Sequence, residues 1–152
     1  MIQLAVISDT HGKLCQDCVD IIKSCDYVIH AGDFGTEKCY KQIKSIGTPM
    51  YMVKGNCDKG IWAVNIPDTL AFRIDKLNFY LIHNIRNLPY NFPKSDIIIS
   101  GHTHVYNVTD EHNVMYLNPG SCSSSRPGSK RTMMILRVTG YDVEVDKKYI
   151  NN

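Results

Sequence analysis

The sequence has no long apolar run and no strong excess of charge of either sign. No stretch approaches the roughly 18 apolar residues that a membrane-spanning helix needs. The run from Ile2 to Ile7 reaches an aspartate before it could serve as the core of a signal peptide. Seventeen Lys and Arg residues against fifteen Asp and Glu leave a formal charge of +2, far from the basic stripe typical of nucleic-acid binding. We expect a cytoplasmic protein without a membrane segment or a nucleic-acid partner.

Internal repeats, heptads and low-complexity tracts are also lacking, apart from a serine-rich segment at residues 121–125. The 152 residues are 43% hydrophobic, which is enough for one compact core. We therefore expect a single domain spanning residues 1–152. A chain of this size does not need disulfides and carries no secretion signal, so we expect reduced thiols. The six cysteines are Cys15, Cys18, Cys25, Cys39, Cys57 and Cys122.

Short apolar runs alternate with helical patterns in the first third of the chain. Runs rich in Val, Ile and Tyr at residues 2–8, 27–30 and 50–53 predict buried strands. Between them, apolar residues recur at helical spacing over 13–24 and 36–46. This β-α-β-α-β order predicts right-handed crossovers and a largely parallel sheet, whose ligands bind at the carboxyl ends of its strands.

The rest of the chain has the pattern of paired strands. Hairpins are expected at residues 70–83, 105–117 and 132–149, where two apolar runs flank a short turn sequence. They predict a second, mixed or antiparallel sheet that faces the first, with the helices on the outside.

Side chains that can bind a metal follow several of the expected strands. The strands run into the sequences SDTHG, HAGDF, VKGNCD, LIHN and GHTHV. Because parallel strands place their carboxyl ends at one edge of a sheet, these side chains should gather there. Carboxylate, carboxamide and imidazole together suit divalent ions such as Mn, Fe, Ni or Zn. The candidate ligands are Asp9, His11, Asp33, Asn56, His83, His102 and His104.

The size of this set predicts two ions. Taken one at a time, an Asp or Asn near a strand end is usually a turn or cap residue, and a single His is usually a satisfied polar side chain. One ion takes roughly four to six donors, whereas this set with a carboxylate able to bridge fits two ions about 3.5–4 Å apart. Glycines adjoin the set at Gly12, Gly32, Gly55 and Gly101, where tight turns favour a residue without Cβ.

The motifs DTHG, GDF, GNCD, the strand-end His83, GHTH and NPGS occur in this order along the chain. Together they resemble the calcineurin-like metallophosphoesterases, especially their small bacterial and archaeal phosphodiesterase branch. Several short motifs in the right order are far more specific than any one alone. The resemblance implies the metallophosphoesterase fold, a four-layer α/β/β/α sandwich of two mixed sheets flanked by helices.

The resemblance also implies a role for each ligand. Asp9, His11 and His104 would hold the first ion, Asn56, His83 and His102 the second, and Asp33 would bridge them. A hydroxide between the ions, available near neutral pH because the cations depress its pKa, would attack phosphorus in line. We expect Asp33, Asn56 and His102 to be catalytic. Among the metals, Mn is favoured over Ni, Fe and Zn.

Two positions depart from the family pattern. Cys57 stands where many relatives carry a His that helps to expel the leaving group, and a neutral thiol with a pKa near ~8.5 is a poor substitute. After His83, relatives usually continue His-Gly-His into a longer crossover helix. Here Pro89 and Pro93 disfavour a regular helix. We expect substrates with easier leaving groups and a more open wall of the cleft.

The predicted function is a phosphodiesterase acting on a small phosphoester, and the chain is compatible with a homo-oligomer. Two alternatives stay open: a phosphomonoesterase or nucleotidase of the same fold, and a catalytically weakened interaction scaffold similar to the retromer subunit that shares this fold. A metal-by-substrate assay separates them.

Other signals are weaker. Cys15 and Cys18 have thioredoxin-like spacing but lie in a helical pattern without a partner pair, which disfavours a redox or zinc role. His30 is expected to pack behind Asp33. Arg126, Lys130 and Arg131 are expected in a solvated loop. Cys57 is expected to be a thiol near the metals and not a nucleophile.

Overall fold

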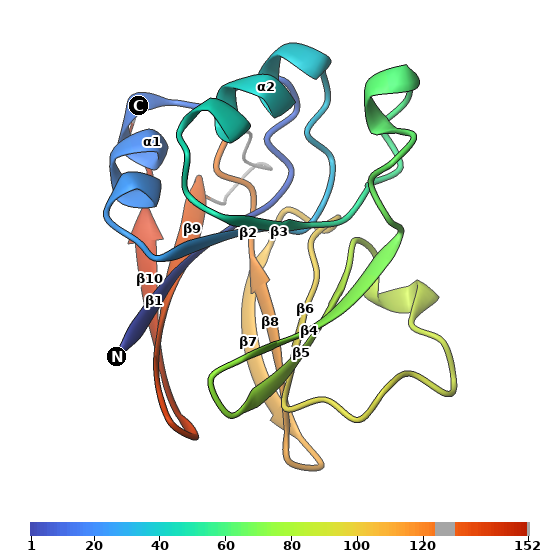
Figure 1. Cartoon of the computed structure of the whole chain (residues 1–152), viewed down its shortest axis with the longest axis vertical. Coiled ribbons are helices and arrows are strands. Elements are labelled where there is room, and N and C mark those ends of the chain that lie inside the picture. The colour runs from blue at the N-terminus through green and yellow to red at the C-terminus, as the bar shows by residue number, and fades with distance from the viewer. Residues whose placement is uncertain (124–129, 152) are drawn as a thin grey trace.

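The computed structural model describes residues 1–123 and 130–151. The segment 124–129, which holds Arg126 and part of the serine-rich tract, and residue 152 lie outside the described residues. Two five-stranded sheets pack against each other, and two α-helices cover the outer face of the first (Figure 1). No helix in the described part of the chain is long and apolar enough to cross a membrane.

The first sheet has the strand order β10-β9-β1-β2-β3. Its parallel part consists of β1 (Ile2–Ile7), β2 (Tyr27–His30) and β3 (Met50–Met52), connected by α1 (Gln16–Lys23) and α2 (Glu37–Ser45). The predicted β-α-β-α-β order is therefore confirmed. The predicted helices are longer than the observed ones, because both begin after an extended residue at the N-cap. At α2 this residue is Thr36, whose side chain accepts a hydrogen bond from the N–H of Cys39 at 3.2 Å.

The last hairpin also belongs to the first sheet. Strand β9 (Thr132–Thr139) pairs antiparallel with β1 on one side and with β10 (Asp142–Tyr149) on the other. Assigning this hairpin to the second sheet is thus wrong. The physical reason is that β9 is apolar on both faces: Met134 packs between the sheets, whereas Met133 packs under the helices. Such a strand needs cover on both sides.

The second sheet has the order β4-β5-β6-β8-β7. Its strands are β4 (Thr69–Ile74), β5 (Leu77–Ile82), β6 (Ile97–Ile99), β7 (Tyr106–Glu111) and β8 (Val114–Pro119). The predicted hairpins β4–β5 and β7–β8 are confirmed, and β6 lies parallel to both β5 and β8. The sheet is therefore mixed, and β5 and β6 end at the same edge.

Three apolar layers hold the architecture together. One core fills the space between the sheets, and a second lies between the first sheet and its helices. On the outer face of the second sheet, Ile98 packs with Leu88 and Phe92 from the segment that links β5 to β6. This segment contains only a 3₁₀ turn, Ile85–Asn87, as the prolines predict. The four-layer sandwich is confirmed, with this segment as its outermost layer.

The inter-sheet core can be tested by matched Val→Ala substitutions. Val138 on β9 is fully buried between the sheets, whereas Val108 on β7 is 40% exposed. Val138→Ala should lower the free energy of unfolding by about 1.5–3 kcal/mol, because it removes buried methyl groups and leaves a cavity. Val108→Ala should cost about 0.5 kcal/mol or less. Urea titrations with unchanged slope measure both, and equal losses would contradict the assigned core.

Candidate metal centre

All the predicted ligands lie at one edge of the sandwich, where five strands end. Asp9 and His11 follow β1, Asp33 follows β2, Asn56 follows β3, His83 follows β5, and His102 and His104 follow β6. Parallel pairing of β1 with β2, β2 with β3, and β5 with β6 directs these strand ends to one side. The two sheets thus contribute to one cluster.

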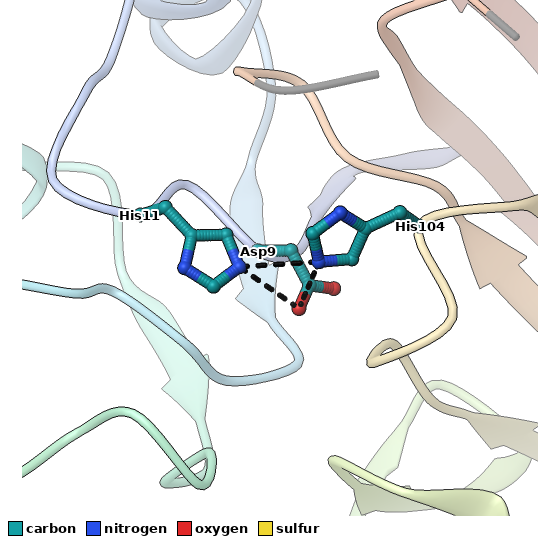
Figure 2. A group of neighbouring side chains, drawn as sticks. All are labelled: Asp9, His11 and His104. Atoms are coloured by element: carbon teal, nitrogen blue, oxygen red, sulfur yellow. Dashed lines mark hydrogen bonds and ion pairs between the residues drawn. The ribbon is translucent and has the colours of Figure 1, made fainter. Parts of the chain in front are cut away.

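Asp9, His11 and His104 form the first half of the cluster, and Figure 2 shows their side chains converging. The Nε2 atoms of the two histidines are 3.1 Å apart. Asp9 Oδ1 lies 3.7 Å from Nε2 of His11 and 3.4 Å from Nε2 of His104. Two imidazole nitrogens and one carboxylate oxygen therefore surround a common point, which is a donor set suited to a transition metal.

The Asp9 carboxylate is satisfied on one oxygen only. Its Oδ2 accepts hydrogen bonds from Ser8 Oγ at 2.6 Å and from the His102 N–H at 2.9 Å. Its Oδ1 is buried and has no hydrogen-bond partner among the described residues. Burial raises the pKa of Asp9, which shows the cost of a charge at this position. A cation at Oδ1 would remove that cost, so the residues present fit a metal ion.

Asn56, His83 and His102 lie together in the second half of the cluster. Asn56 Oδ1 is 3.0 Å from His83 Nε2 and 3.2 Å from His102 Nδ1. His83 Nδ1 lies 2.7 Å from the carbonyl oxygen of Ala31. Because a carbonyl only accepts, Nδ1 carries a proton, and Nε2 faces the cluster as a potential ligand.

Asp33 lies between the two halves. Its Oδ2 is 3.7 Å from His11 Nε2 and 3.2 Å from His83 Nε2, so a single oxygen faces both groups. Its Oδ1 accepts the N–H of Cys57 at 2.8 Å. Burial acts to raise the pKa of Asp33, but hydrogen bonds from His83 and Cys57 and the charge of His83 and His11 outweigh it and lower the pKa well below its usual range. Asp33 is therefore ionised at neutral pH.

The Cys57 side chain is exposed, and its sulfur lies within 4.8 Å of potential ligand atoms of His11 and Asp33. Partial burial and the nearby charge of Asp33 raise the pKa of the thiol. At neutral pH Cys57 is thus a protonated thiol beside the candidate ligands.

The backbone at the cluster is held in an uncommon conformation. Left-handed φ angles, between 46° and 72°, occur at Asp9, His11, Asp33, His102 and His104. Non-glycine residues rarely adopt this region, and each such residue stores strain of roughly 1–3 kcal/mol unless its surroundings enforce it. Strain at so many candidate ligands indicates that their placement is imposed by the rest of the fold.

Asp58 is the residue that enforces much of this geometry, and it was missed in the sequence. Its Oδ2 accepts the N–H groups of Asp33 and Gly55, each at 2.9 Å, and its Oδ1 accepts the N–H of Gly35 at 3.0 Å. Asp58 is buried and fixes the loop after β2 to the loop after β3. The only sign of this role in the sequence is that Asp58 ends the GNCD motif, and an aspartate at that place is equally typical of an ordinary turn.

The NPGS motif has a similar supporting role. Asn118 donates hydrogen bonds to the Gly101 carbonyl at 3.0 Å and to Thr103 Oγ1 at 3.1 Å, and its Oδ1 accepts the N–H of Gly120. Ser121 donates to the Asp9 carbonyl at 2.7 Å. The motif therefore holds the loops that carry the histidines of GHTH and the first aspartate.

At two of the predicted glycines, neighbouring atoms lie too close to the backbone for any larger residue. A Cβ at Gly55 would collide with the Asp33 carboxylate, and a Cβ at Gly101 would collide with Ser8 Oγ. At both positions the backbone of one loop packs directly on a carboxylate or its hydrogen-bond donor.

His30 lies outside the ligand cluster, as predicted. It is fully buried, and its ring stacks on Phe34 with centroids 3.7 Å apart. Its Nδ1 accepts the N–H of Gly32 at 3.0 Å, and Nε2 lies 3.1 Å from Thr10 Oγ1. Burial lowers the pKa of His30 to about 3, so the ring is neutral and structural.

A cavity of about 610 Å³ opens beside the second half of the cluster. Besides Asn56, His83 and His102, its polar lining consists of Lys54, Asp58, Lys59, Asp68, Thr69, Asn84 and Asn87, and Lys54 Nζ lies 3.8 Å from Asp68 Oδ1. The wall next to His83 comes from Asn84 and Asn87 in the short segment that links β5 to β6. The cavity therefore offers amide and ammonium donors to a polar ligand close to the clustered histidines.

Comparisons with known proteins agree with this geometry. The sequence model of the calcineurin-like phosphoesterase superfamily domain matches residues 2–140. A probable metallophosphoesterase of Methanothermobacter thermautotrophicus is 26% identical over an alignment 158 positions long with gaps, which covers 94% of this chain and 90% of the relative. A phosphodiesterase of Methanocaldococcus jannaschii is 27% identical over 139 aligned residues, which cover 79% of this chain and 84% of the relative.

The fold is also found in solved structures. Vacuolar protein sorting 29 from Cryptosporidium parvum superposes with a TM-score of 0.79 and 19% identity, covering 97% of this chain and 98% of that one. At this identity the similarity shows a shared fold and not a shared activity. The family match spans nearly the whole chain, and the chain belongs to the calcineurin-like phosphoesterase superfamily, a family of metal-dependent hydrolases of phosphoesters.

Proposed function

We propose that the protein is a phosphodiesterase that cleaves a small phosphoester with a hydroxide held between two divalent ions. The observation that carries the proposal is the position of Asp33, a buried carboxylate whose Oδ2 lies 3.7 Å from His11 Nε2 and 3.2 Å from His83 Nε2. An ionised carboxylate between two groups of imidazoles suits a bridge between two cations.

The proposed ligands divide between the two halves of the cluster. Asp9, His11 and His104 hold one ion, Asn56, His83 and His102 hold the other, and Asp33 is shared. Bound there, the ions supply a hydroxide near neutral pH and offset the negative charge of the phosphoryl group. We propose Mn as the metal, with Ni, Fe and Zn as alternatives, because carboxylate, amide and imidazole donors together can hold any of these ions. The cytoplasm is the proposed location.

The chain's own residues position the reaction. The Ala31 carbonyl fixes the tautomer of His83, and Asp58 fixes the loops of Asp33 and Asn56. Asn56 and His102, which line the cavity of about 610 Å³, face the substrate side. We propose that they orient the phosphoryl group, and that the lysines and amides of the cavity bind one of its ester groups.

Preference for a diester is supported by the related enzyme of Methanocaldococcus jannaschii, which is named a phosphodiesterase. The exposed thiol of Cys57 also offers a leaving group little help from a general acid. A second candidate function is a protein-interaction scaffold, favoured by the similarity in fold to vacuolar protein sorting 29.

The proposed function predicts two divalent ions per chain and hydrolysis that depends on them. Protein stripped of metal and reloaded with Mn, Ni, Fe or Zn should bind two ions and cleave an aryl phosphodiester faster than the matching monoester. Elemental analysis and parallel assays measure this. At most one ion at saturation, with hydrolysis insensitive to chelator, would overturn the proposal, and a faster monoester would identify a phosphomonoesterase.

If Asp33 bridges the two ions, replacing it should reduce the rate of hydrolysis more than replacing a residue that binds one ion. Asp33→Asn weakens both sites and removes a negative charge between two cations, so the rate at saturating metal should fall by on the order of 100-fold or more. His83→Ala should cost less, because it affects one ion. Asp110→Asn, an exposed acid on β7 that does not line this cavity, is the matched control and should be near wild type. Similar residual rates for Asp33→Asn and His83→Ala would refute the bridge.

Cys57 predicts a steep dependence of the rate on the pKa of the leaving group. Without an imidazole to assist departure, activated aryl esters should react far faster than alkyl esters. Cys57→His should flatten this dependence by improving poor leaving groups selectively, whereas Cys57→Ser should leave the slope unchanged. The series is compared at equal metal occupancy, because a new imidazole can bind an ion. Parallel slopes for wild type and Cys57→His would make Cys57 a bystander.

A further inference from the structure

Three thiols gather at the start of α1, away from the proposed ligands. Cys15 directly precedes the helix, Cys18 lies in its first turn, and Cys122 lies in the loop that follows β8. The sulfur atoms of Cys15 and Cys18 are 3.4 Å apart. Cys18 and Cys122 lie in the same buried cluster, and the proximity of the Cys122 thiol raises the pKa of Cys18. The sequence gives the pair thioredoxin-like spacing but no partner, and the fold supplies Cys122 from a distant segment.

The distance between Cys15 and Cys18 is close to what a disulfide needs. A disulfide has an S–S length of about 2.0 Å, so closure requires the sulfurs to approach by roughly 1.4 Å. Cys15 is the N-cap residue of α1 with an extended backbone, and Cys18 lies in the first turn of the helix. Their side chains are neighbours, and rotation about the side-chain bonds brings the sulfurs closer.

The thiols differ in access. Cys15 is half-buried, whereas Cys18 and Cys122 are buried. Burial raises the pKa of Cys15, while the backbone N–H of Cys18 and the charge of Arg131 act in the opposite direction. The nearby Cys122 thiol, and burial after it, raise the pKa of Cys18 far above its usual value. A small reagent in solvent therefore meets Cys15 first.

We propose that Cys15 and Cys18 form a thiol–disulfide exchange site for small disulfides. The Cys15 thiolate attacks one sulfur of the small disulfide, which forms a mixed disulfide and releases one small thiol. Cys18 then loses its proton, which its raised pKa makes the slower step, and its sulfur attacks Cys15 Sγ and expels the second small thiol. Two cysteine thiols are oxidised to one protein disulfide, one small disulfide is reduced, and the two protons pass to the released thiols.

Cys122 positions Cys18 in this reaction. Its loop is anchored by the neighbouring Ser121 and Ser123, whose hydroxyls both donate to the Asp9 carbonyl. The Cys122 thiol thus has a fixed place next to Cys18, and it holds the resolving sulfur within reach of Cys15. A linkage between Cys18 and Cys122 is the competing outcome.

The test exposes reduced, metal-loaded, full-length protein to oxidised glutathione. Wild type should lose two of its six thiols as an internal disulfide, and peptide mapping should join Cys15 to Cys18. Cys18→Ser should stop at a glutathione adduct on Cys15. Cys15→Ser, at the more accessible position, should form no internal disulfide, which keeps the test decisive if Cys18→Ser folds poorly.

Two controls separate the site from general thiol reactivity. Cys25→Ser replaces another half-buried thiol and should form the same linkage as wild type. In urea the preference for joining Cys15 to Cys18 over other pairs should fall, because neighbouring positions along the helix and the contact with Cys122 are lost. A linkage of Cys18 to Cys122, or glutathione found only on the exposed Cys57 while Cys15 and Cys18 stay reduced, would overturn the proposal.

Discussion

The half-satisfied carboxylate of Asp9 is the constraint on which the site depends. Ser8 and the backbone of His102 saturate one oxygen, while the other is buried without a hydrogen-bond partner among the residues described. Leaving a buried acceptor unpaired costs about 1–3 kcal/mol, and more when it is charged. His11 and His104 direct ring nitrogens toward that oxygen. The arrangement suits a positive charge, and Asp33, whose Oδ2 faces both His11 and His83, connects this half of the cluster to the other.

Strained loops and buried hydrogen bonds are two parts of the same structure. Left-handed backbone at the ends of β1, β2 and β6 turns the side chains toward one another. Buried acceptors and donors then hold these turns in place: Asp58 binds three N–H groups across two loops, and Asn118 binds the backbone of the GHTH loop. Removing the support would release the strain and misplace several ligands at once, so these residues belong to the site although they contact no ion.

Much of this arrangement could be predicted from sequence, and the limits have physical causes. Strand periodicity and the rule that parallel strands share a carboxyl edge were enough to gather the ligands from Asp9 to His104. Which of the two sheets the β9–β10 hairpin joins could not be predicted from its turn sequence. A hairpin signal is local, whereas the pairing of β9 with β1 joins the two ends of the chain. Asp58 and the contact of Cys18 with Cys122 were missed because they also depend on distant loops meeting in space.

The two sides of the proposed reaction differ in how completely this chain equips them. For preparing the nucleophile, the chain has every proposed ligand. Asp33 is ionised because hydrogen bonds from His83 and Cys57 and nearby charge outweigh its burial. The side that assists departure has a thiol whose pKa is raised by partial burial and by the charge of the same Asp33. The carboxylate that favours two cations thus disfavours a thiolate and leaves Cys57 a weak acid. Such an enzyme cleaves fastest the substrates whose leaving groups depart without accepting a proton. Its substrate selectivity then depends on the leaving group as much as on the shape of the cavity.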